Sequence, residues 1–164
     1  MAKPSVDYLA ILETLCRHSV DFVIVGGVGA VLHGAPLATF DLDVVHSREP
    51  HNLDRIMSAL KELEAQYRIP GRKDMKPGLS HLASAGHQLL MTRFGPLDLL
   101  GTIGKGDDYA QLLDETVELE IGESLKVRVL SLEGLVRSKE ETGQEKDKAV
   151  LPVLRQVLRE RSKR

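Results

Sequence analysis

Two aspartates stand in an otherwise apolar segment, the run FDLDVV over residues 40–45. A run of this kind predicts a largely buried strand. Side chains two residues apart in a strand lie on the same face, about 6 to 7 Å apart, so Asp41 and Asp43 are expected side by side. Two carboxylates in a partly apolar setting repel each other and lose hydration, and a cation is needed to balance them. The segment is therefore a candidate cation site, although an aspartate pair in a strand is more often part of a solvated edge or turn.

A third aspartate, Asp98, has apolar neighbours on both sides in PLDLL, residues 96–100. If its strand pairs beside the first, the three carboxylates meet. Such a group of hard oxygen ligands suits Mg²⁺ or Mn²⁺. Divalent ions held in this way support phosphoryl or nucleotidyl transfer.

An apolar run also ends in two adjacent glycines, Gly26 and Gly27. Backbone amides near the start of a helix can approach a phosphate closely where no Cβ stands in the way. This glycine step is therefore expected to contact the triphosphate of a nucleotide.

Hydrophobic periodicity divides the 164 residues into helices and strands. Helices are expected over residues 5–18, 28–34, 50–67, 107–113, 131–141 and 146–158, and strands over 21–25, 40–47, 87–94, 97–103, 116–122 and 125–131. Residues 68–81 are rich in proline, glycine and basic residues, which predicts an exposed loop. The order predicts an α/β (α+β) fold, a small mixed sheet flanked by helices, with C-terminal helices, as one domain over residues 1–164.

Composition excludes several classes of function. The formal net charge is −2 and 28% of residues are charged, so no strong overall field draws the chain to nucleic acid or an anionic membrane. The single cysteine, Cys16, excludes a disulfide within the chain and is expected to be a small buried apolar residue. No apolar run approaches the length of a membrane span and no signal peptide is evident, so a cytoplasmic location is expected.

The order of these motifs resembles the polymerase-beta-like nucleotidyltransferase superfamily. An apolar strand ends in Gly-Gly, a short helix follows, then a strand with D-x-D and a later strand with an aspartate between apolar residues, over the first hundred or so residues. The segment LSLEGLVRSKEETGQEKDKAVLPVL is similar to the helix pair of the minimal and AbiEii-like (type IV toxin) branch. Its K-x6-K-D pattern falls on Lys139, Lys146 and Asp147.

The resemblance implies a nucleotidyltransferase fold and an enzyme that moves a nucleoside monophosphate from a nucleoside triphosphate to an acceptor hydroxyl. The acceptor is a tRNA, a protein or a small molecule, and a role as the toxin of a toxin-antitoxin pair implies an antitoxin partner. Metal binding falls on Asp41, Asp43 and Asp98, and catalytic assistance on Lys139. Nucleotide contacts fall on Gly26, Gly27, Lys146 and Asp147.

Two departures from the superfamily pattern keep other hypotheses open. Relatives often have serine where Gly27 stands, and an arginine shortly before the threonine that corresponds to Thr39, where this chain has Leu37 and Ala38. A catalytically degenerate protein that binds nucleotide or a partner protein is one alternative. A metal-dependent phosphate hydrolase is another.

Further basic and histidine residues are candidates for binding roles. Arg72, Lys73 and Lys76 lie in the expected loop, where they could receive an acceptor RNA or a phosphate, although a solvated loop is the simpler interpretation. His33 either contacts substrate or has a structural role, and the structural role is favoured.

Overall fold

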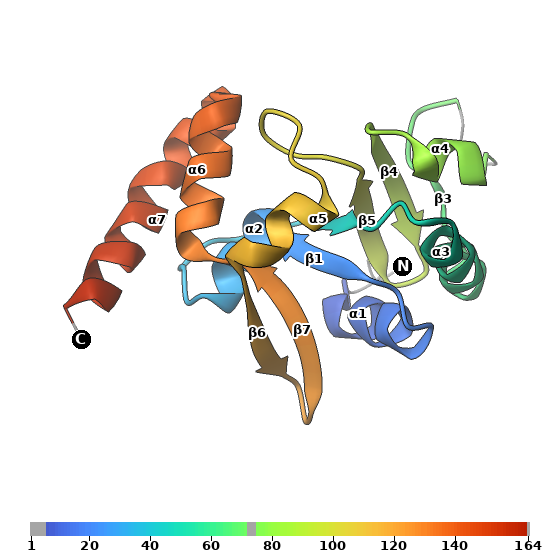
Figure 1. Ribbon diagram of the computed structural model, residues 1–164, viewed down its shortest axis with the longest axis horizontal. Coiled ribbons are helices and arrows are strands. Elements are labelled where there is room, and N and C mark those ends of the chain that lie inside the picture. The colour runs from blue at the N-terminus through green and yellow to red at the C-terminus, as the bar shows by residue number, and fades with distance from the viewer. Residues whose placement is uncertain (1–5, 72–74, 164) are drawn as a thin grey trace, which may run out of the picture.

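The structure is a computed structural model that describes residues 6–71 and 75–163. The helices are α1 (Tyr8–Arg17), α2 (Gly26–Leu32), α3 (Pro50–Glu62), α4 (Leu79–Ala83), α5 (Tyr109–Leu112), α6 (Leu132–Thr142) and α7 (Glu145–Ser162), with a 3₁₀ turn at Leu113–Glu115. The strands are β1 (Phe22–Val25), β2 (Leu42–His46), β3 (Gln66–Tyr67), β4 (His87–Thr92), β5 (Gly95–Leu100), β6 (Thr116–Ile121) and β7 (Leu125–Leu130) (Figure 1). Within the described ranges, no helix is both long and apolar enough to cross a membrane.

The strands form one mixed sheet in the order β3-β4-β5-β2-β1-β7-β6. β1 runs antiparallel to β2 and parallel to β7, and β2 runs parallel to β5. The remaining neighbours, β3-β4, β4-β5 and β6-β7, are antiparallel. The predicted mixed α/β sheet with C-terminal helices is confirmed.

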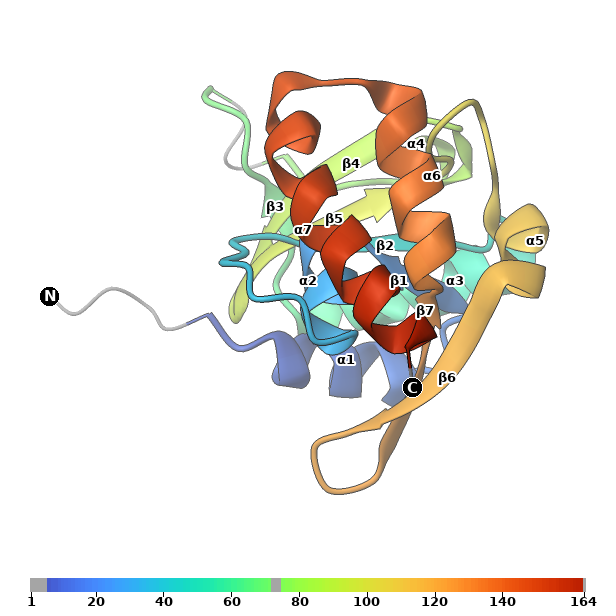
Figure 2. The ribbon, with the colours of Figure 1, turned by 90° about the vertical axis from the view of Figure 1, so that its left-hand side faces the viewer.

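Apolar side chains bury both faces of the sheet. Along β1, Phe22 and Ile24 belong to the core that α1 and α3 cover, whereas Val23 and Val25 belong to the core on the other face. Leu132 and Leu135 of α6 and Leu154 of α7 close that second core. In Figure 2, α6 and α7 lie in front of the sheet. Because alternate residues of a strand face opposite sides, the uninterrupted apolar run of β1 follows from burial on both faces.

The largest departure from the predicted elements follows α3. The helix was expected to reach Tyr67 but ends at Glu62, and Glu64 then adopts a left-handed conformation with φ 54°. The chain turns there and enters the sheet, where Tyr67 pairs with Leu90. Residues 68–81, predicted to be a loop, also contain the start of α4.

Helix starts differ from the prediction by a few residues. Asp7 caps α1 by accepting a hydrogen bond from the Ala10 amide at 3.0 Å, and the expected start at Ser5 lies outside the described residues. α2 begins at Gly26 and includes the glycine step. Cys16 is half-buried against the core, near its expected environment.

His33 attaches the C-terminal helix to the body of the protein. Its Nε2 lies 2.8 Å from the Leu130 carbonyl oxygen, which can only accept, so Nε2 carries the hydrogen. Nδ1 then accepts from Arg161 Nη1 at 3.0 Å, and Arg161 Nη2 donates to the His33 carbonyl at 2.7 Å. The favoured structural role of His33 agrees with these contacts.

This arrangement makes stability depend on pH. Burial lowers the pKa of His33, and the Arg161 charge lowers it further, while burial also lowers the pKa of His46. A histidine whose pKa is depressed in the folded state contributes stability above its unfolded pKa of about 6.5 and loses it as the pH falls. We expect the free energy of unfolding, measured with urea, to decrease as the pH falls below about 6.5.

A His33→Gln variant is expected to show a weaker pH dependence than the wild type, whatever its stability at neutral pH. His51, which is exposed on α3, supplies the control variant His51→Gln. An unchanged pH dependence in His33→Gln would contradict the role assigned to His33.

Candidate functional site

A row of neighbouring residues crosses four strands of the sheet. Val25 of β1 pairs with Asp43 of β2, Asp43 with Asp98 of β5, and Asp98 with Leu89 of β4. The parallel pairing of β2 with β5 thus brings two aspartates from distant parts of the chain side by side. This is the strand pairing needed for the three carboxylates to meet.

A cleft of about 660 Å³ lies over this row. Its walls come from the start of α2, the segment before β2, β4, the loop after β5, and α6 and α7. The site residues expected from the sequence, where their side chains are described, all line it: Gly26, Gly27, Asp41, Asp43, Asp98, Lys139 and Asp147. Lys146 belongs to α7, and its side chain lies outside the described part of the structure.

The three aspartates differ in burial. The Asp41 side chain is 45% exposed and precedes β2, whereas the Asp98 side chain is only 9% exposed. The exposure of Asp43 is intermediate. Removing a carboxylate from water is costly without a compensating charge, so Asp98 has the strongest need of a cation.

The glycine step lies directly beside the acidic strand. Gly26 has φ 64°, and a Cβ there would lie against Asp43 Oδ2 and 3.1 Å from Asp43 Cγ. At Gly27, a Cβ would lie 2.7 Å from the Thr39 hydroxyl oxygen. The two glycines therefore allow α2 to approach the acid-bearing segment closely, a packing reason that adds to the expected contact with phosphate.

Arg68 supplies a positive charge that the sequence analysis missed. Its Nη1 lies 2.7 Å from Asp98 Oδ1, and its Nη2 lies 3.7 Å from Asp41 Oδ2. Burial by itself lowers the pKa of Arg68, but the contact with Asp98 and the charges of Asp98, Asp41 and Asp43 outweigh burial and raise it. The guanidinium therefore stays charged among the acids.

The carboxylates suit a hard cation, although Arg68 already stands among them. In residues 6–71 and 75–163, no three acidic, histidine or cysteine side chains are arranged as ligands of one metal ion. Asp98 Oδ1 is buried and, among the described residues, has no hydrogen bond of good geometry despite the nearby Arg68. Asp41 and Asp43 line the same cleft with carboxylate oxygens, the ligand type that Mg²⁺ and Mn²⁺ prefer. Residues suited to an ion are thus present.

Tyr8 holds the segment before Asp41 in place. Its hydroxyl donates to the Thr39 carbonyl oxygen at 3.0 Å. Burial raises the pKa of Tyr8, and the charges of Asp41 and Asp43 raise it further.

Next to Thr39, Phe40 is 78% exposed and lines the cleft. An exposed aromatic ring at the wall of a cleft is available for stacking.

Lys139 and Asp147 pair with each other on the α6-α7 side. Lys139 Nζ lies 3.2 Å from Asp147 Oδ1, and the Thr142 hydroxyl donates to Asp147 Oδ2 at 2.8 Å. Asp147 is buried, with 6% of its surface exposed. The two ends of the K-x6-K-D pattern therefore form an ion pair at the cleft.

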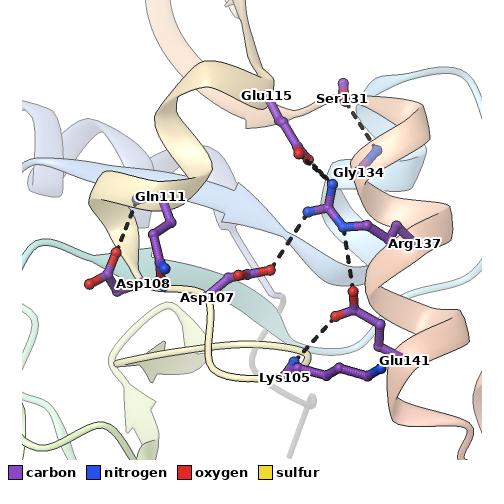
Figure 3. A network of polar contacts seen from close by, with 9 residues as sticks. All are labelled: Lys105, Asp107, Asp108, Gln111, Glu115, Ser131, Gly134, Arg137 and Glu141. Carbon is purple, nitrogen blue, oxygen red and sulfur yellow. Dashed lines mark hydrogen bonds and ion pairs between the residues drawn. The ribbon is translucent and has the colours of Figure 1, made fainter.

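A second ionic network ties α6 to the loop after β5. Arg137 contacts Glu115, Asp107 and Glu141 (Figure 3). It lies 3.7 Å from Asp107 Oδ2 and 3.6 Å from Glu141 Oε1. The Lys105 amide donates to Glu141 Oε2 at 3.2 Å. The strand that carries Asp98 and the helix that carries Lys139 are thereby connected through the loop between β5 and α5.

The other basic residues singled out in the sequence do not add to this cleft. Arg72 and Lys73 lie outside the described residues. Lys76 is exposed and lies beside α3, away from the acids. Arg68, four residues before Arg72, is the basic residue that reaches them, because the early end of α3 brings it next to β4.

Comparison with known proteins identifies the fold. No protein-family model and no curated protein matches the sequence. A crystal structure from Thermotoga maritima, described as a "putative nucleotidyltransferase", is similar to this chain, with a TM-score of 0.57 and 20% sequence identity. The match covers 93% of this chain and 91% of the other. The protein therefore has the fold of that structure, as expected.

The close approach at Gly26 generates a stability prediction. We expect Gly26→Ala to lower the free energy of unfolding by about 1–2 kcal/mol, because alanine is strained in the left-handed backbone conformation. The loss should be larger still, because the new methyl group displaces the Asp43 carboxylate. Gly143→Ala is the matched control, because Gly143 has φ 59° and its nearest neighbour would lie 4.0 Å from the new Cβ. Urea unfolding of both variants measures the difference, and equal losses would contradict a contact-specific role for Gly26.

Proposed function

We propose that the protein is a divalent-metal-dependent nucleotidyltransferase. The observation that carries this proposal is the row of strand partners that sets Asp43 beside Asp98 in one cleft with the glycine step and Lys139. The fold shared with the Thermotoga maritima structure supports it. The substrates are a nucleoside triphosphate and an acceptor that bears a hydroxyl group.

In this proposal, Asp41 and Asp43 supply carboxylate oxygens to Mg²⁺ or Mn²⁺, with Asp98 beside them. An ion held by these residues would neutralise phosphate charge and polarise the phosphoryl oxygens. Backbone amides at Gly26 and Gly27 orient the triphosphate. Among the described residues that line the cleft, Lys139 is the lysine. In this proposal its side chain turns from Asp147 toward the phosphates when they bind.

The proposed reaction is an in-line displacement at the α-phosphorus. The acceptor oxygen forms a bond to phosphorus while the bond from phosphorus to the bridging oxygen breaks, and pyrophosphate leaves with the electron pair. Asp98 receives the proton of the acceptor hydroxyl and returns it to solvent. The nucleoside monophosphate remains on the acceptor.

A binding protein without catalysis is the second candidate. Arg68 is paired with Asp98, and Lys139 is paired with Asp147, which favours a cleft whose charges are already balanced. Labelled nucleotide distinguishes the candidates. Label transferred to an acceptor supports the transferase, free phosphate supports a hydrolase, and retention of unchanged nucleotide supports binding alone.

The acceptor class and biological role remain part of the proposal. We favour an acceptor hydroxyl on tRNA, on a protein or on a small molecule, and a role as the toxin of a toxin-antitoxin pair. The resemblance of the C-terminal helices carries this role. Growth arrest of bacteria that express the wild type but not Asp43→Asn would support it, and normal growth with both would oppose it.

The direct test of transfer uses Asp43→Asn. We expect label transfer from a nucleoside triphosphate, with Mg²⁺ and total RNA or cell lysate, to fall at least about a hundredfold, because a bound metal ion contributes several kcal/mol to such reactions. Asp54→Asn, on the exposed face of α3, is the control and should keep the wild-type rate. Transfer that is independent of Asp43 in a folded variant would contradict the proposal.

Phe40 is expected to stack on a base of the nucleotide or acceptor. Stacking of a base on an aromatic side chain contributes about 1–3 kcal/mol, so Phe40→Ala should weaken nucleotide or RNA binding by roughly fivefold to 150-fold. Because Phe40 is 78% exposed, the substitution should leave the unfolding free energy nearly unchanged. Fluorescence titration measures the affinity, with Phe40→Trp as the variant expected to retain it. Equal affinity of Phe40→Ala and the wild type would exclude stacking.

A further inference from the structure

Arg68 occupies the space between two of the three carboxylates. It follows β3, and its guanidinium reaches Asp98 at 2.7 Å and Asp41 at 3.7 Å. The row across the sheet continues to it, because the Arg68 amide donates to the carbonyl of Leu89, the strand partner of Asp98. Arg68 is therefore positioned by the sheet itself.

The guanidinium is also anchored at its far end. Nη1 donates to the Leu90 carbonyl oxygen at 2.7 Å, and the side chain is only 24% exposed. Backbone and side-chain contacts with β4 thus fix both ends of the residue. A cation held in this way is part of the site, unlike a solvated surface arginine.

Charge balance explains why a fixed cation stands there. Asp98 is 7% exposed, and a carboxylate buried to that degree is unstable without a nearby positive charge. Asp43 adds a second carboxylate at the neighbouring strand position. Arg68 compensates the buried acid, while the more exposed Asp41 lies at the edge of its reach.

We propose that Arg68 is a resident cation that takes the place of a second metal ion at Asp98, so that the cleft binds one divalent ion, at Asp41 and Asp43. This inference rests on the proposed function, because the ion is the one that phosphate transfer requires. Asp98 then acts on the acceptor proton without binding metal. The guanidinium adds a fixed positive charge beside the transferred phosphate.

Counting bound Mn²⁺ tests the proposal on the full chain. The free Mn²⁺ signal in electron paramagnetic resonance is followed while Mn²⁺ is added to the protein. We expect the wild type to bind one ion, Asp43→Asn to lose it, and Arg68→Gln to bind two because Asp98 becomes available. Arg68→Lys keeps the charge and should bind one. Arg55→Gln, exposed on α3, is the control for loss of an arginine.

Each other outcome overturns the proposal. Two ions on the wild type would show that Arg68 does not exclude metal from Asp98, and this result stands even if Arg68→Gln fails to fold. One ion on a folded Arg68→Gln variant would show that Arg68 does not replace a metal. No ion on the wild type would remove the site at Asp41 and Asp43.

The label-transfer assay on the same samples separates this inference from the proposed function. Two ions with normal transfer would refute the role of Arg68 and leave the transferase intact. One ion without transfer to any acceptor would refute the transferase and leave the cation assignment intact.

Discussion

The parallel pairing of β2 with β5 brings Asp43 beside Asp98. The negative charge of these carboxylates must be balanced, and this requirement determines which side chains can lie next to them. Asp98 lies in a strand whose neighbouring side chains are buried, so a cation must accompany it. Arg68 fulfils that requirement through a 2.7 Å ion pair. The early end of α3 and the short strand β3 matter because together they deliver this arginine to the acids.

Close packing around the acids shapes the rest of the cleft. Gly26 leaves room for the Asp43 carboxylate, and Gly27 leaves room for the Thr39 hydroxyl. On the α6 side of the cleft, Arg137 ties the helix that carries Lys139 to Asp107 in the loop after β5. Because Arg68 and Lys139 are already paired with acids, an anionic ligand has to exchange with an internal carboxylate to reach either of them. In the proposed function, a metal ion bound together with the ligand would lower the cost of that exchange, since the ion would supply the missing positive charge.

Much of this arrangement could be predicted from the sequence. The apolar run around Asp41 and Asp43, and the similar run around Asp98, carry a strong strand signal, and two strands that each place an acid among apolar residues are readily paired. The ion pair of Arg68 could not be predicted in the same way. The helical pattern of residues 50–67 continues to Tyr67 in the sequence. The left-handed turn at Glu64, which no feature of the sequence indicates, redirects the chain into the sheet. The exposure of Phe40 could not be predicted either, because it depends on β2 beginning at Leu42 and not at Phe40.

The central claim is that the acids of this cleft bind a divalent ion together with a nucleotide. Anomalous X-ray diffraction from crystals grown with Mn²⁺ and a non-hydrolysable nucleoside triphosphate tests it most directly. We expect a manganese peak between the Asp41 and Asp43 carboxylates, with the triphosphate beside Gly26 and Gly27 and with Arg68 still on Asp98. A manganese peak away from these aspartates, or a nucleotide bound outside the cleft, would contradict the account.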